Sequence, residues 1–145
     1  MNQSLRDELQ GLRARLEPHR RSVRVRIWGQ LARLGGVHDF GRRFWITLDP
    51  VIYYPLDVDP ESPAHETTIR HELVHIRQQR QRGLTPWLIK YVGSARFRYE
   101  QERDAFLVDV RAGADPRAIA VSLARDYKLR AISVDQMAAW LGSKR

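Results

Sequence analysis

The segment His71-Glu72-Leu73-Val74-His75 places two histidines four positions apart, with a glutamate directly after the first. On an α-helix, His71 and His75 lie only about 40° apart around the axis, so both imidazoles can reach one ion. Two neutral imidazoles and a third protein ligand hold zinc with one position left for water. Zinc lowers the pKa of that water from about 15.7 to about 7, and the carboxylate of Glu72 is placed to accept its proton. The pattern therefore indicates metal-assisted hydrolysis.

The surrounding sequence predicts that this segment is helical. Ser62 is a suitable N-cap, Pro63 fits the first helical position and Gly83 is a natural end. Three apolar residues fall on the side opposite the histidines and can anchor the helix in a core: Ile69, Leu73 and Ile76. The alternative is a coincidental pair on an exposed helix face, but this composition predicts only about 0.008 such matches by chance.

No histidine follows His75 and the chain has no cysteine, so the downstream candidates for a third metal ligand are carboxylates. A predicted helix over residues 94–111 offers three acids, Glu100, Glu102 and Asp104. Glu100 and Glu102 lie about 200° apart around that helix, so only one of them can face the metal. Helix geometry alone leaves the choice open.

The two segments together resemble a known family. The histidine pair followed by Glu102-Arg103-Asp104-Ala105 is similar to the HExxH and ExxA segments of small thermolysin-like zinc metallopeptidases, the gluzincins of the minimal "minigluzincin" type. The resemblance implies that Glu102, rather than Glu100, completes the zinc site with His71 and His75. It also implies a zincin-like fold and covers roughly residues 23–110, including the segment FWITLDPVIYYP (residues 44–55) as the edge-strand region.

The chain departs from the gluzincin pattern at one position. Thermolysin-like members carry an acidic residue four positions after the third ligand, where it orients a ligand histidine, and here that residue is Phe106. Asp109 or a backbone carbonyl would have to take over this role. The chain therefore needs an orienting group that the family motif does not supply.

Four aromatic or hydroxyl residues are candidates for contact with the substrate or the transition state. Tyr99 and Tyr91 could donate to the transition state, although each is also a common type of half-buried aromatic residue. Trp45 and Thr47 share one face of a predicted strand and could border a peptide cleft. An edge strand near residues 44–48 would bind an extended peptide by strand addition.

The elements that must position these residues form one α+β domain over residues 1–145. We expect a small twisted sheet packed on the active-site helix and on a second, ligand-bearing helix, with a core of about residues 23–110. Hydrophobic periodicity and end signals predict, besides the two ligand-bearing helices, an N-terminal helix (4–17), strands (22–28, 43–48 and 51–55), a helix from residue 85 and C-terminal helices within 116–141.

The composition narrows the class of protein. The absence of cysteine excludes disulfides and thiolate ligands, so Zn²⁺ must be held by imidazole and carboxylate. No apolar run approaches the roughly 18 residues that span a bilayer, and no signal peptide is visible, so we expect a soluble cytoplasmic protein without membrane association. Its substrate would be a peptide or protein, or else a non-peptide amide such as a cell-wall crosslink.

The net charge of +8 allows an alternative function. A catalytically inactive module could keep the zinc scaffold as structure and use its basic surface to hold an acidic partner. The arginines are scattered and carry no nucleic-acid-binding signature, so nucleic acid is not the expected partner, although the basic surface leaves it open. The sequence does not indicate an oligomeric state.

Overall fold

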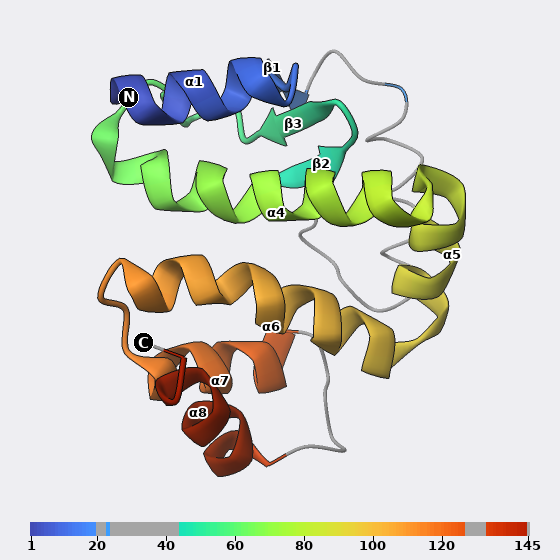
Figure 1. Ribbon diagram of the computed structural model, residues 1–145, viewed down its shortest axis with the longest axis vertical. Coiled ribbons are helices and arrows are strands. Elements are labelled where there is room, and N and C mark those ends of the chain that lie inside the picture. The colour runs from blue at the N-terminus through green and yellow to red at the C-terminus, as the bar shows by residue number, and fades with distance from the viewer. Residues whose placement is uncertain (20–22, 24–43, 127–132, 145) are drawn as a thin grey trace. The chain divides into compact units, whose positions relative to one another are not determined.

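A computed structural model describes residues 1–19, 23, 44–126 and 133–144 (Figure 1). Within these residues the chain is α+β, with six α-helices and a three-stranded mixed sheet. It divides into two compact units, residues 1–84 and 85–145. The α+β class is as predicted, while the zincin-like fold and the single domain stay predictions.

In its described residues the first unit combines the sheet with two α-helices. Its elements are α1 (Gln3–Gly11), β1 (Arg15–Pro18), β2 (Ile46–Leu48), β3 (Val51–Tyr54), the 3-10 turn η2 (Pro63–His65) and α4 (Glu66–Arg82). The strand order is β1-β3-β2; β1 runs parallel to β3, and β2 runs antiparallel to it with Thr47 opposite Ile52. Among the described strands β2 is therefore at an edge, and the strands predicted within 43–48 and 51–55 are confirmed as β2 and β3.

The N-terminal helix predicted over residues 4–17 is wrong in its second half. The helix ends at Gly11, Arg13 takes a positive φ of 46°, and residues 15–18 form β1. The apolar spacing continued past Gly11, but backbone pairing with β3 takes these residues into the sheet instead. Asn2 caps the helix by accepting from the backbone N–H of Leu5. The strand predicted at 22–28 lies outside the described residues, apart from Val23.

The first unit has one hydrophobic core, which fixes the orientation of α4. Side chains from α1, β3 and α4 meet in this core, which consists of Leu5, Leu9, Ile52, Ile69, Leu73 and Ile76. The last three residues are those expected opposite the histidines, and all three are fully buried. Ser62 caps the 3-10 turn before α4, and Gly83, with φ of 79°, ends the helix as predicted. The core therefore turns the histidine face of α4 away from itself.

The second unit is helical. Its elements are α5 (Leu84–Gly93, beginning at the last residue of the first unit), α6 (Ala95–Arg111), α7 (Pro116–Asp126) and α8 (Val134–Gly142). Helices α6, α7 and α8 enclose a separate core of Tyr99, Val110, Ile119, Ala120, Leu123, Met137 and Leu141. Ser94 caps α6, Ser133 forms a capping box on α8, and Gly113 turns the chain after α6 with φ of 101°. The C-terminal helices predicted within 116–141 are confirmed.

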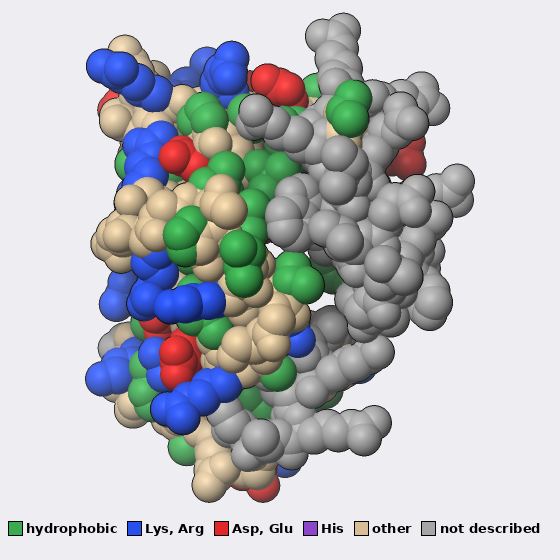
Figure 2. Space-filling model, turned by 90° about the vertical axis from the view of Figure 1, so that its right-hand side faces the viewer, with side chains coloured by type: hydrophobic (Ala, Val, Ile, Leu, Met, Phe, Trp, Pro, Cys, Tyr) green, Lys and Arg blue, Asp and Glu red, His purple; other side chains and the backbone are tan. Residues whose placement is uncertain are grey.

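The surface in Figure 2 displays both hydrophobic and basic side chains. On α5, Ile89 and Val92 expose 68% and 52% of their area. In the part of the chain that is described, no helix combines the length and apolar character needed to cross a membrane.

Candidate metal centre

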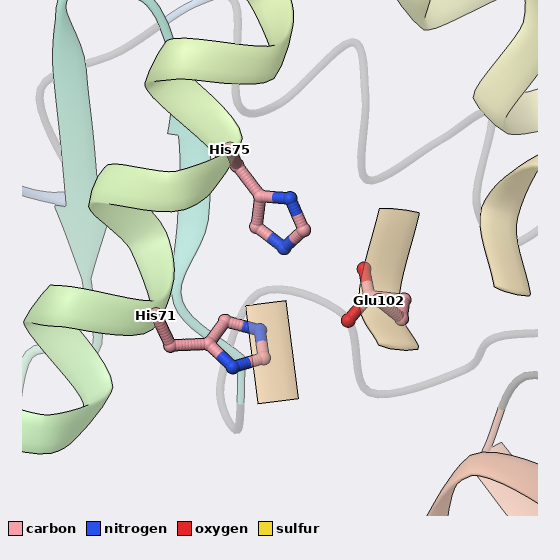
Figure 3. Close-up of side chains that lie close together, drawn as sticks. All are labelled: His71, His75 and Glu102. Carbon is pink, nitrogen blue, oxygen red and sulfur yellow. The ribbon is translucent and has the colours of Figure 1, made fainter. Parts of the chain in front are cut away.

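Helix α4 presents both histidines on one side. His71 and His75 project from neighbouring turns of the helix (Figure 3), their ring centroids are 5.1 Å apart, and both side chains are buried. The hydrophobic core occupies the opposite side of the helix, so the sequence fixes this orientation through the spacing of its apolar residues. The pair is therefore arranged as the sequence predicted.

Gln78 orients one of these imidazoles. Nδ1 of His75 donates to Oε1 of Gln78 at 2.8 Å. An amide oxygen only accepts, so the proton is on Nδ1 and the lone pair of Nε2 is left for a metal. Hydrogen bonds of this kind fix the tautomer and ring orientation of metal-binding histidines. Sequence reasoning assigned such a role to Asp109 or a backbone carbonyl and placed Gln78 next to the two histidines without giving it this role, although its spacing of three from His75 on one helix was a usable signal.

The carboxylate of Glu72 is held by the sheet. Thr47 Oγ1 donates to Oε2 of Glu72 at 2.6 Å, and both residues are only 7% exposed. Hydrogen bonds to an ionised carboxylate are stronger than neutral ones, so this contact holds the side chain in place. Thr47 was predicted to border a peptide cleft. In the structure its hydroxyl contacts Glu72, the predicted general base.

Gln79 joins α4 to the edge strand. Its side chain is 1% exposed; Nε2 donates to the backbone oxygen of Thr47 at 2.9 Å, and Oε1 accepts from the backbone N–H of Asp49 at 2.8 Å. The helix therefore also bonds to the backbone of Thr47, the residue whose hydroxyl holds Glu72. The two partners of Gln79 lie 30 and 32 residues earlier in the chain, so no local pattern in the sequence predicts these bonds.

Glu102 is a buried carboxylate on α6. It is 1% exposed, and its Oε1 accepts a hydrogen bond from the phenol of Tyr91 on α5. Ionised carboxylates inside proteins are paired or bind metals. Tyr91 was predicted as a transition-state donor, and the structure places it on the predicted third ligand. Glu100, the other acid considered, pairs with Arg96, whose side chain is exposed.

Two further predicted residues belong to the cores. Tyr99 is buried among α6, α7 and α8; burial raises the pKa of its phenol above 10.0, and among nearby charges Arg103 lowers that pKa while Asp104 raises it. Trp45 packs against the core of the first unit, with its ring centroid 5.9 Å from Tyr54 and 5.7 Å from His65. These contacts do not test a role in binding substrate.

His71, His75 and Glu102 form a group that could hold a metal ion (Figure 3). Each residue offers one ligand atom, these atoms all lie within 4.8 Å of one another, and all three residues are buried. Two imidazoles and one carboxylate are a donor set that suits a catalytic zinc ion, because three protein ligands leave one coordination position for water or substrate. The residues present therefore fit a divalent transition metal.

Comparison with protein-family models, with curated proteins and with solved structures gives no match for this chain. Inferences about its function therefore depend on the arrangement of its own residues.

Proposed function

We propose that the chain is a zinc-dependent metallopeptidase of the small gluzincin type, with a zincin-like fold. In this proposal His71, His75 and Glu102 bind the metal and Glu72 is the general base. One observation carries it: three buried side chains of the right types offer ligand atoms within 4.8 Å of one another, and a fourth, the buried Glu72, directly follows the first histidine.

The residues have separate tasks in the proposed reaction. Zinc bound by the three ligands supplies a water of lowered pKa and polarises the scissile carbonyl. Gln78 accepts from Nδ1 of His75 and so assigns Nε2 as the nitrogen that binds the metal. Glu72 takes a proton from the attacking water and passes it to the leaving amine. Thr47 holds Oε2 of that carboxylate, which reduces the freedom of Oε1 to leave the position where it exchanges the proton.

The edge strand limits how a peptide substrate can pair. Strand addition uses backbone groups that point away from the neighbouring strand. Two such groups, the oxygen of Thr47 on β2 and the N–H of Asp49 directly after it, already bond to Gln79. An extended substrate would therefore pair with groups that precede the carbonyl of Thr47. The paired segment would then end beside the hydroxyl of Thr47, which holds Glu72, so cleavage is expected near that end of the segment.

The proposal is tested by measuring metal content and hydrolysis together. Elemental analysis of the purified chain is expected to find about one zinc per chain, and an unstructured polypeptide is the substrate for the assay. Glu72→Gln is expected to keep the zinc and to lose about 10²- to 10⁴-fold in rate, because it removes the general base. Glu102→Gln is expected to lose zinc, whereas the matched control Glu100→Gln, on the same helix, keeps both zinc and activity.

Three outcomes would contradict the proposal. A wild-type chain without bound metal removes the site, and an active Glu72→Gln variant removes the assigned base. Full zinc occupancy without hydrolysis across a broad peptide library favours the inactive zinc-scaffold module; salt-sensitive binding of an acidic partner would then support it. Hydrolysis of a non-peptide amide alone would keep the metal site and change the substrate class.

A further inference from the structure

Helix α5 carries an aromatic pair that leads to Glu102. Trp87 and Tyr91 are four residues apart, so they lie on the same side of α5. Their rings stack with centroids 4.5 Å apart and planes inclined by 18°. Trp87 is buried and Tyr91 is half-buried, so the pair is a fixed part of the second unit rather than a surface feature.

Both aromatic side chains end in hydrogen bonds to consecutive residues of α6. Nε1 of Trp87 donates to Oε1 of Gln101 at 2.9 Å, and the phenol of Tyr91 donates to Oε1 of Glu102. Gln101 and Glu102 are themselves almost fully buried. The Trp87–Tyr91 pair thus fixes the rotation of α6 about its own axis at Glu102, whose carboxylate Tyr91 contacts.

The end of α5 is secured to α6 by a further contact. The guanidinium of Arg98 donates to the backbone oxygen of Tyr91 at 2.7 Å, and this carbonyl belongs to the last turn of α5. A cation at the C-terminal end of a helix also interacts favourably with the helix dipole. The backbone of Tyr91 is therefore fixed as well as its ring, and its phenol has little freedom to leave the carboxylate.

We propose that Tyr91 is a positioning residue for the metal site, which holds the carboxylate of Glu102 in the orientation that binds the ion, and that Trp87 supports it by stacking. This inference rests on the proposed function and adds a determinant of metal affinity outside the HExxH and ExxA segments. The phenol bonds to Oε1 of Glu102 and thereby restrains the orientation of the carboxylate. Partners of this kind typically change metal affinity by about 10- to 100-fold when they are removed.

The test compares Tyr91→Phe with the wild type by chelator competition for zinc. The variant keeps the stacked ring and loses only the hydroxyl, and its dissociation constant is expected to rise about 10- to 100-fold. The visible absorption of the cobalt-substituted protein is a second readout, and we expect the bands of the variant to change because the carboxylate is no longer fixed. Neither readout depends on hydrolysis.

The matched control is Tyr54→Phe, which removes a phenol from the sheet of the first unit and is expected to leave zinc affinity unchanged. Thermal unfolding of the metal-free proteins shows whether Tyr91→Phe retains the fold. A wild type that binds no zinc overturns the proposed function together with this inference. Zinc binding by the wild type with equal or tighter binding by a folded Tyr91→Phe overturns the inference alone.

Discussion

Helices α4 and α6 are both 17 residues long, but their buried polar groups are held by different means. On α4, Glu72 bonds to Thr47 of β2, and Gln79 bonds to Thr47 and to Asp49 just after this strand, so the sheet supports the helix. On α6, Gln101 and Glu102 bond to two aromatic side chains of the preceding helix. The difference teaches that most residues of the candidate site lie on a helix supported by the sheet, whereas Glu102 of the second unit is held by a side chain of the short helix α5.

The largest expected effects come from the two separate cores. Leu73→Ala and Leu123→Ala each remove a fully buried side chain, one from each unit, and each is expected to lower the free energy of unfolding by about 2–5 kcal/mol. Urea denaturation measures the loss, and hydrogen exchange shows where it occurs. If the units are energetically distinct, Leu73→Ala weakens amide protection in α4 more than in α7; equal loss in both helices would contradict that separation.

An intermediate effect is expected from two adjacent glutamines of α4. Gln79→Ala leaves the oxygen of Thr47 and the N–H of Asp49 without this partner, and the free energy of unfolding should fall by about 1–3 kcal/mol. Gln78→Ala acts on the imidazole of His75, so zinc affinity should fall about 10- to 100-fold while stability changes less. Denaturation and chelator competition on both variants check the assignment, and a reversed pattern would show that the two roles are exchanged.

The smallest effect is confined to alkaline solution and to the second unit. Because burial raises the pKa of Tyr99 above its value in the unfolded chain, the unfolded state loses this proton first as the pH rises. The associated stability is complete below about pH 10 and is lost as the pH rises through the pKa of the folded state. Tyr99→Phe should therefore lose less stability than the wild type between neutral and strongly alkaline pH, as measured by urea denaturation. Equal losses would show that this phenol does not contribute.

The sequence predicted the local features of the site well. The positions of His71 and His75 on one face, the core residues opposite them and the end of the helix at Gly83 follow from spacings of three and four residues and from capping signals. The predicted start at Ser62 and Pro63 is instead the start of the 3-10 turn that precedes α4. The pairing of Glu102 with these histidines came from a family resemblance rather than from geometry, because the two segments are 27 residues apart. Local periodicity contains no information about which helix faces meet.

The hydrogen-bond partners could not be predicted for the same reason. Thr47 reaches Glu72 across 25 positions and Gln79 reaches Thr47 across 32, and Gln78 and Gln79 look like solvated residues in a basic helix. The misassigned end of α1 has a related cause: residues 15–18 keep a helical apolar spacing, yet pairing with a strand 36 residues later decides their conformation. Tertiary hydrogen bonds override a local pattern in both cases.

The amide of Gln79 has a consequence that extends beyond a single chain. An unsatisfied strand edge is a template for edge-to-edge pairing between molecules and so for aggregation. The side chain of Gln79 presents a donor and an acceptor to β2, much as the peptide group of an incoming strand would. By occupying these positions from within, α4 protects this end of the edge against self-association.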